Sequence, residues 1–258
     1  METGEEASLR LPPARLIRWE IFAVFAVSLG ASAVNALLDL IGALLSRQSL
    51  GHQQALLVGP LAVNPWLDLA LQLAGIAEAL TPVVLVLYLM ARSGEPPSVI
   101  GLDASQPVRD TLRGAVLAAL IGGAGLALYL TAYHAGISLT VVPENLPAVW
   151  WRIPVLLLSA AHDGILEEIL VIGYLLTRLD QLGWTPWKAI LLSAVLRGSY
   201  HLYQGFGAFI GNAAMGIIFG ILYRRWGRVT PLIIAHTLID AVAFTGYAAL
   251  HGKVSWLP

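Results

Sequence analysis

Two adjacent carboxylates, Glu167 and Glu168, lie in the middle of residues 153–177, a stretch that is otherwise almost wholly apolar and long enough to cross a bilayer. An ionisable group at that depth is costly, so it commonly marks a working site. Two later apolar stretches carry His201 and His236. Carboxylates and imidazoles move protons near neutral pH, so this pattern predicts acid-base chemistry inside the membrane.

The spacing of these groups indicates that they share helix faces, because residues four apart on a helix lie on the same side. Three such pairs occur: Asp163 with Glu167, Arg197 with His201, and His236 with Asp240. Buried polar groups in lipid need partners, so we expect the helices that carry these pairs to converge on one shared cavity. The alternative is a structural polar cluster that holds a helix bundle together.

Several kinds of intramembrane chemistry are excluded by the sequence. The chain has no cysteine, which removes thiolate zinc sites and a cysteine nucleophile, and it has no H-E-x-x-H run of the zinc-protease type. Ser199 lacks the glycine setting of a serine nucleophile, and an aspartyl dyad would have only Asp163 and Asp240. A site of Glu and His side chains that activates water remains, acting directly or through a metal.

Membrane helices must position these groups, because 57% of the residues are hydrophobic and 12% are charged. Stretches of about 20 apolar residues cross a hydrocarbon core of about 30 Å. The sequence therefore predicts an all-α, polytopic transmembrane bundle of about seven spans, between six and eight. The stretches are 19–45, 67–91, 114–133, 153–177, 187–204, 207–223 and 231–250. The first stretch could instead be a signal peptide with residues 21–29 as its apolar core.

The positions of Arg and Lys support this arrangement, since short cytoplasmic loops collect positive charge. With the amino terminus inside, the inner segments hold Arg10, Arg15, Arg18, Arg92, Arg109, Arg113, Arg178, Lys188, Arg224, Arg225 and Arg228. The outer segments hold Arg47, Arg152 and Lys253. Arg197 alone falls within a span and needs a carboxylate partner. We expect an integral multi-pass protein with a cytoplasmic amino terminus. The strong excess of Arg over Lys suggests a bacterium with a GC-rich genome, so we expect the protein in a bacterial plasma membrane.

No internal repeat or long linker divides the chain. Residues 1–15 predict a short disordered cytoplasmic lead, and residues 16–258 predict a single membrane domain. The formal net charge is −1 and no basic patch occurs beyond the loops. We therefore expect the lipid bilayer as a partner and no nucleic acid.

Three ordered motifs resemble those of the CPBP family of intramembrane proteases, which includes the CAAX prenyl endopeptidases and proteins of bacteriocin processing and self-immunity. That family carries a double glutamate followed by an arginine, then an aromatic residue shortly before a histidine, then a histidine followed four residues later by asparagine. The similar runs here are Glu167-Glu168, Leu196 to His201, and His236 to Asp240. The resemblance spans about residues 95–250.

The resemblance implies an intramembrane endopeptidase that hydrolyses a peptide bond of a membrane-associated peptide or protein. By this resemblance, Glu167 is the general base that polarises a water, and His201 helps to activate or position that water. Glu168 is a supporting carboxylate. His236 and Asp240 steady the developing oxyanion.

Two positions depart from the family pattern. The motif arginine corresponds to Ile172, whereas Arg197 stands in the place of the aromatic residue. We hypothesise that the guanidinium has moved to the neighbouring helix and still pairs with Glu168. The second departure is Asp240, where asparagine is common. An ionised Asp cannot donate to an oxyanion, so we expect it to orient His236 or to bind a metal.

The use of a metal is left open by the sequence. Glu167, His201 and His236 form the His2Glu set of catalytic zinc sites, but the same residues can act as a base and as oxyanion donors without Zn²⁺. Straight parallel helices would also place these three residues at different depths, so the site requires tilted helices or a cone-shaped cavity open to water.

Two alternatives to proteolysis remain. The missing motif arginine suggests a catalytically degenerate scaffold or a bacteriocin self-immunity factor. A proton-coupled transporter is disfavoured, because the sequence has no inverted repeat. The remaining candidates for the cavity wall or the outer shell of the site are His162, Asp163, Tyr200, Tyr203, Gln204 and Asn212.

Overall fold

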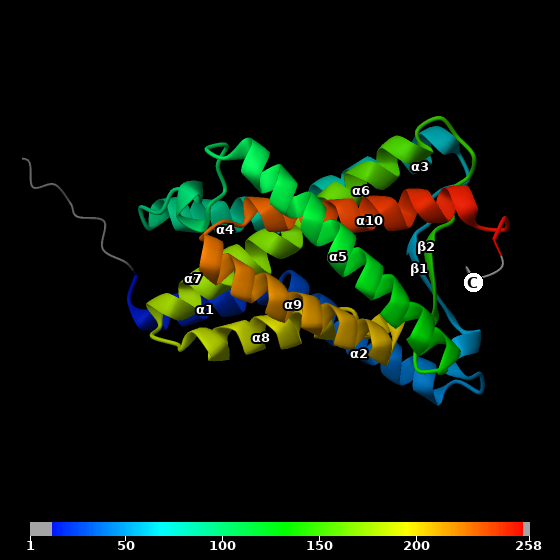
Figure 1. The fold of residues 1–258 in the computed structure, drawn as a ribbon, viewed down its shortest axis with the longest axis horizontal. Coiled ribbons are helices and arrows are strands. Elements are labelled where there is room, and N and C mark those ends of the chain that lie inside the picture. The colour runs from blue at the N-terminus through cyan, green and yellow to red at the C-terminus, as the bar shows by residue number, and fades with distance from the viewer. Residues whose placement is uncertain (1–11, 255–258) are drawn as a thin grey trace, which may run out of the picture.

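The computed structural model describes residues 12–254, and nearly all of their regular structure is helical (Figure 1). The helices are α1 (Ala14–Ala26), α2 (Leu29–Leu45), α3 (Pro65–Ala79), α4 (Thr81–Arg92), α5 (Pro107–His134), α6 (Arg152–Glu167), α7 (Leu175–Gln181), α8 (Pro186–Ser199), α9 (Phe206–Trp226) and α10 (Thr230–Leu250). Three 3-10 turns are η1 (Leu50–His52), η2 (Pro97–Ile100) and η4 (Leu202–Gln204). A π-helical segment, η3 (Glu168–Tyr174), joins α6 to α7. The predicted all-α class is confirmed, apart from one short sheet.

The predicted count of seven spans is not confirmed. Among the described residues, four helical segments are long and apolar enough to cross a membrane: Pro65–Arg92, Pro107–His134, Phe206–Trp226 and Thr230–Leu250. A fifth is possible if α1 and α2, which are bent by 48° at their junction, form one span. Helix α8 has 14 residues, which is about 21 Å and too short for the core of a bilayer.

Part of the predicted disordered lead lies outside the structural description. Residues 1–11 are not among the described residues. Helix α1 begins at Ala14, within the predicted lead of residues 1–15. Its Glu20 accepts hydrogen bonds from Tyr174 Oη and Arg178 Nε, at 2.9 and 2.8 Å, so α1 is tied to the centre of the fold.

Local sequence signals explain several helix boundaries. Asn64 caps α3 by accepting hydrogen bonds from the backbone N–H groups of Trp66 and Leu67, at 3.0 and 3.1 Å. Helices α3, α5, α8 and α10 each have a proline in their first turn, where no backbone donor is required. Gly227 ends α9 in the left-handed conformation, with φ of 63°. Each of these signals is local, so the sequence specifies these helix ends without reference to the rest of the fold.

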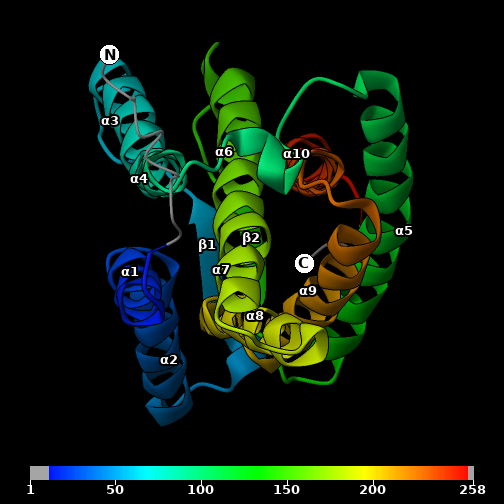
Figure 2. The ribbon, with the colours of Figure 1, turned by 90° about the vertical axis from the view of Figure 1, so that its left-hand side faces the viewer.

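A central rod consisting of α6, η3 and α7 organises the bundle. Figure 2 shows α1 to α4 on one side of this rod, and α9, α10 and α5 on the other. A two-stranded parallel sheet, β1 (Gln54–Val58) with β2 (Thr140–Glu144), closes one end, with Gln54 opposite Thr140. The sheet is absent from the elements expected from the sequence, because each strand is only five residues long.

Glycines allow the helices that carry the polar groups to approach one another closely. A Cβ on Gly164 of α6 would lie 2.6 Å from Thr237 Oγ1 of α10. A Cβ on Gly216 of α9 would lie 2.9 Å from Ala194 Cα of α8. Small residues at these two positions therefore let the helix backbones approach closely, and both contacts lie near residues of the polar site.

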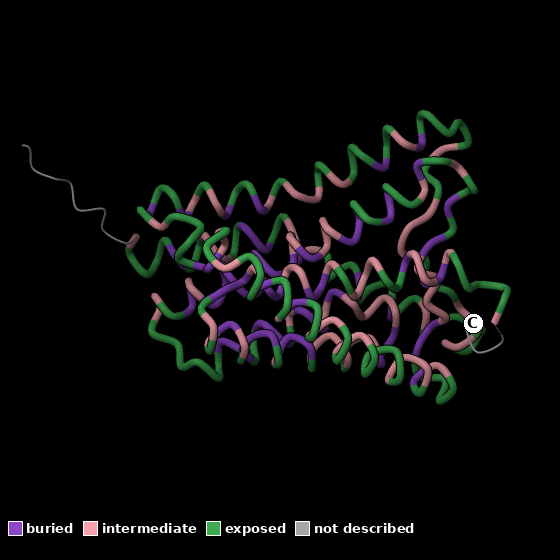
Figure 3. Tube along the Cα trace, turned by 45° about the horizontal axis from the view of Figure 1, so that its top comes forward, coloured by how far each residue is buried: buried purple, intermediate pink, exposed green. Residues whose placement is uncertain are grey.

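The burial pattern is that of a bundle surrounded by lipid. Figure 3 shows buried positions gathered in the interior and exposed positions along the outer helices. Large apolar side chains are exposed on α5, such as Leu112, Val116 and Leu120. An exposed apolar surface of this kind is stable in hydrocarbon. The buried core centres on η3, where Leu170, Val171 and Ile172 pack with residues of α4, α9 and α10.

Candidate active site

The double glutamate lies where the central rod changes from α-helix to π-helix. Glu167 is the last residue of α6 and Glu168 is the first residue of η3. Single π-helical turns inside α-helices are frequent at functional sites. Glu167 lines a cavity, whereas Glu168 is 0% exposed and lies behind the cavity wall. The two carboxylates therefore have different surroundings, which their adjacency in the sequence did not reveal.

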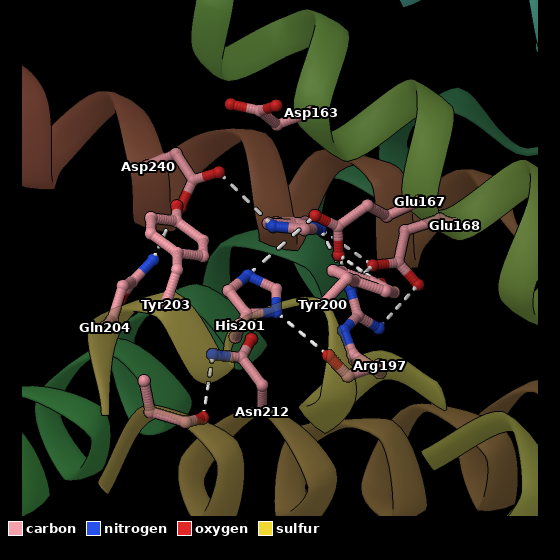
Figure 4. A network of polar contacts seen from close by, with 12 residues as sticks. Asp163, Glu167, Glu168, Arg197, Tyr200, His201, Tyr203, Gln204, Asn212 and Asp240 are labelled. Carbon is pink, nitrogen blue, oxygen red and sulfur yellow. Dashed lines mark hydrogen bonds and ion pairs between the residues drawn. The ribbon is translucent and has the colours of Figure 1, made fainter. Parts of the chain in front are cut away.

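Arg197 of α8 joins the two carboxylates. Its Nη1 donates to Glu168 Oε2 at 3.3 Å, and its Nη2 donates to Glu168 Oε1 and, at 3.1 Å, to Glu167 Oε2. The guanidinium is 0% exposed. The hypothesised pairing of Arg197 with Glu168 is therefore present in the structure (Figure 4). Ile172, at the position of the missing motif arginine, lies in the apolar core.

His236 of α10 lies between two carboxylates. Its Nδ1 is 2.8 Å from Glu168 Oε1, and its Nε2 is 3.2 Å from Asp240 Oδ2. Nδ1 also lies 3.0 Å from Arg197 Nη2. Asp240 therefore contacts His236 as expected for an orienting residue. Both ring nitrogens of His236 face partners, so an oxyanion role for His236 would require one of these contacts to open.

His201 faces Glu167 across a short gap. His201 lies in the turn after α8, and its Nδ1 is 3.0 Å from the backbone oxygen of Arg197. A carbonyl oxygen only accepts, so Nδ1 carries the proton in this contact, and the neutral ring presents a lone pair at Nε2. His201 Nε2 lies 3.9 Å from Glu167 Oε1. This separation is too long for a direct hydrogen bond and suits a bridging water.

Tyr200 completes the surroundings of Glu167. Its Oη donates to Glu167 Oε2 at 2.7 Å. Tyr200 was expected only at the cavity wall or in the outer shell of the site, but its side chain is buried and hydrogen-bonded to the carboxylate. The signal that could have found it is its position three residues after Arg197 and next to His201, on the same turn.

One cavity of about 1140 Å³ brings the predicted residues together. Glu167, His201, His236 and Asp240 line it, and so do the outer candidates His162, Asp163, Tyr203, Gln204 and Asn212. Much of the remaining wall is apolar or small, from α3, α5, α9, α10 and the two strands. The predicted convergence on one shared cavity is present, and the polar groups are concentrated where α6 and α10 meet the turn after α8 (Figure 4).

The position of His201 removes the difficulty over depth. The predicted span 187–204 is not a continuous helix, because α8 ends at Ser199 and the chain turns through η4. Gly205 then adopts φ of 103°, which an L side chain rarely adopts, and α9 starts at Phe206. His201 is thus held by a turn beside Glu167 instead of deep in a straight helix.

The predicted zinc set of Glu167, His201 and His236 does not fit a metal in this arrangement. Both nitrogens of His236 are engaged by carboxylates, and the Arg197 guanidinium lies 3.0 Å from Nδ1. A divalent cation next to a guanidinium would be repelled. Within residues 12–254, no group of three or more His, Asp or Glu side chains is placed to hold a metal ion.

Comparison with known proteins identifies one matching family model, described as type II CAAX prenyl endopeptidase Rce1-like. The match covers residues 149–242, which contain all of the predicted catalytic residues and Arg197. No curated protein and no solved structure matches the chain. The match confirms the resemblance predicted from the three motifs.

Proposed function

We propose that this chain, whose residues 149–242 match the family model described as type II CAAX prenyl endopeptidase Rce1-like, is a CAAX-type intramembrane protease. We propose further that it cleaves a peptide bond with water activated by Glu167 and His201. The main support for this proposal is the distance of 3.9 Å between Glu167 Oε1 and His201 Nε2. Both residues line the same cavity. Two acceptors that face each other at this distance can hold one water through its two protons. That water would lie against the space open to a substrate.

The proposed reaction is general-base hydrolysis. Glu167 Oε1 takes a proton from the water while the water oxygen attacks the carbonyl carbon of the scissile bond. The resulting tetrahedral intermediate carries the negative charge on its oxygen. Glu167 then returns the proton to the amide nitrogen, the C–N bond breaks, and a carboxylic acid and an amine leave. His201 holds the water through Nε2 and orients its attack.

Glu168 and Arg197 support this chemistry from behind the cavity wall. The positive charge of Arg197 faces both glutamates, so the two adjacent carboxylates are tolerated at one buried site. Glu168 also binds His236, which in turn contacts Asp240. This chain of contacts fixes α6, α8 and α10 around the water position.

Tyr203 and Asn212 are the donors proposed for the oxyanion. Both line the cavity. Tyr203 Oη accepts from Gln204 Nε2 at 2.8 Å, which leaves its own proton free to donate. Asn212 Nδ2 uses one proton on the backbone oxygen of Ala208 at 3.1 Å and keeps a second. The family resemblance assigns this role to His236 and Asp240 instead.

The substrate proposed for this site is an apolar peptide segment at the membrane. Apolar and small side chains make up most of the cavity wall away from the polar groups. An apolar segment would fill that wall, and its backbone would reach Glu167 at the polar end. A leader peptide, a lipoprotein and a prenylated terminus all share this apolar character.

Comparative peptidomics of membranes tests the function. The gene is deleted from cells that normally encode this protein, and the deletion strain is complemented with the wild type or with Glu167→Gln. New protein termini are then mapped in each membrane fraction. We expect cleavage products that depend on the wild type and are absent with Glu167→Gln, because an amide cannot serve as the base. A matched control is Asp39→Asn, which changes a carboxylate on α2 that does not line the cavity.

The same experiment separates the alternatives. Equal products with Glu167→Gln, in protein that is folded and inserted, would refute hydrolysis by this residue. A phenotype that Glu167→Gln complements fully, without any cleavage product, would favour the scaffold or self-immunity function. Proton-coupled transport would instead require flux of a solute in proteoliposomes that contain the purified protein.

A further inference from the structure

We infer that Tyr200 is a positioning residue that determines which oxygen of Glu167 acts as the base. This inference rests on the proposed hydrolysis at Glu167 and names a residue that the family motifs do not include. Tyr200 Oη donates to Glu167 Oε2 at 2.7 Å. A carboxylate oxygen only accepts, so the phenolic proton points at Glu167.

The two oxygens of Glu167 are not equivalent. Oε2 accepts from Tyr200 Oη at 2.7 Å and from Arg197 Nη2 at 3.1 Å. Oε1 faces His201 Nε2 at 3.9 Å, beyond hydrogen-bond distance. The lone pairs of Oε2 are therefore directed at the protein, and those of Oε1 remain for a water. A glutamate held at one oxygen in this way cannot rotate its carboxylate without losing two donors.

One turn of the chain supplies all three groups that surround Glu167. Arg197, Tyr200 and His201 are spaced i, i+3 and i+4 along α8 and the turn that follows it, so their side chains share one face. The rings of Tyr200 and His201 also pack with centroids 4.8 Å apart. The same turn thus holds the water-binding imidazole and the phenol that orients the carboxylate.

Tyr200 does not touch the substrate in this arrangement. It is 6% exposed and is not part of the cavity wall, whereas Glu167 and His201 are. Its role is therefore to act through Glu167. Loss of the phenolic oxygen should change the orientation and basicity of the carboxylate more than the binding of a peptide.

Kinetics of Tyr200→Phe provide the first test, on a substrate identified by the peptidomics described above. The ring is retained, so its contact with His201 should persist. We expect kcat to fall roughly tenfold to a hundredfold with KM nearly unchanged, the scale found when a partner that orients a functional group is removed. The acid limb of the pH profile should move to higher pH, because a carboxylate with fewer hydrogen bonds binds its proton more readily.

Tyr223→Phe is the matched control. Tyr223 is also buried, and its Oη lies 3.3 Å from Thr177 Oγ1, in a different part of the bundle. This variant loses a buried hydroxyl of the same kind without a contact to Glu167. We expect its kcat and pH profile to match those of the wild type, and thermal unfolding in detergent verifies that both variants fold.

Infrared spectroscopy gives a readout that needs no substrate. The difference spectrum between the wild type and Glu167→Gln isolates the carboxylate stretching bands of Glu167 in protein labelled with ¹³C-glutamate. Repeating this difference in a Tyr200→Phe background should shift the antisymmetric band, since one hydrogen bond to Oε2 is gone. The same difference in a Tyr223→Phe background should leave the band in place.

The outcomes distinguish this inference from the proposed function. An unshifted band, or a Tyr200→Phe enzyme with wild-type kcat and pH profile, would overturn the role of Tyr200 while leaving hydrolysis by Glu167 intact. A shifted band in a protein whose wild type cleaves no substrate would overturn the proposed function, and the catalytic role of Tyr200 with it. A shifted band together with reduced kcat supports both.

Discussion

Arg197 donates hydrogen bonds to both carboxylate oxygens of Glu168, which lies 29 positions earlier in the chain. Both side chains are fully buried. The family pattern has its arginine one turn after the double glutamate, where this chain has the core residue Ile172. The structure shows that a guanidinium from α8 reaches the same carboxylate, so the charge of the buried doublet is compensated from another helix.

Substitutions at Arg197 and Glu168 should have non-additive effects on the stability of the protein. Arg197→Ala leaves two buried carboxylates short of their cation, and we expect a loss of about 3–5 kcal/mol in the free energy of unfolding. Adding Glu168→Gln should recover part of that loss, which a double-mutant cycle in detergent measures. Arg224→Ala with Asp180→Asn is the control cycle, since that pair is partly exposed and should couple by less than about 1 kcal/mol. Independent, additive effects of the two changes at 197 and 168 would contradict the pairing.

A methyl group added at Gly164, where α6 contacts α10, should destabilise the protein. A Cβ on Gly164 would lie 2.6 Å from Thr237 Oγ1 and 3.0 Å from the backbone nitrogen of Thr237. We expect Gly164→Ala to cost roughly 1–3 kcal/mol of unfolding free energy, because two helices must separate to admit it. Gly123→Ala on α5 meets no atom within 4 Å and serves as the control. Equal stability of the two variants would show that α6 and α10 do not meet as described.

Asp240 should tolerate asparagine better than an apolar residue. Its carboxylate lies 3.2 Å from His236 Nε2, and an asparagine oxygen can accept from the same nitrogen. We expect Asp240→Asn to keep product formation within about tenfold of the wild type, and Asp240→Leu to lower it by roughly tenfold to a hundredfold. Product termini in membranes of complemented cells provide the measurement. Full activity of Asp240→Leu would show that the orientation of His236 is unimportant.

The ion pair between Asp103 and Arg228 should contribute less to the stability of the fold at acidic pH. Hydrogen bonds from Arg228 and Ser105 lower the pKa of Asp103 below its usual value of 3.8. A carboxylate with a lowered pKa stabilises the fold at pH values above 3.8 and loses that contribution as the pH falls through its folded value. The difference in Tm between wild type and Asp103→Asn should therefore be constant from pH 7 to about pH 5 and shrink below pH 4. A difference that grows on acidification would reverse the sign and refute the link.

Metal removal should leave the reaction unaffected. Both nitrogens of His236 face carboxylates, so the His2Glu set cannot close around an ion without breaking these contacts. We expect purified protein to carry far less than one zinc per chain and to cleave its substrate equally with and without a chelator. Activity that a chelator abolishes and added Zn²⁺ restores would require a different arrangement of His236.

The sequence alone determined the class of this protein and the residue types of its site. Hydropathy and helical spacing are local properties, so an apolar helical bundle with acid-base groups facing inwards followed from residues such as Glu167 and Asp240. Local rules could not determine the number of spans, because the shortness of α8 depends on the turn around His201 and Gly205.

The tertiary structure decided how the acid-base groups are divided among roles. Glu167 and Glu168 are neighbours in the chain, yet only Glu167 reaches the cavity. Tyr200 binds one oxygen of Glu167, and the pairing of Glu168 with His236 joins residues 68 positions apart. Such contacts depend on how closely whole helices pack, at positions such as Gly164, and no periodicity within a single helix encodes that distance.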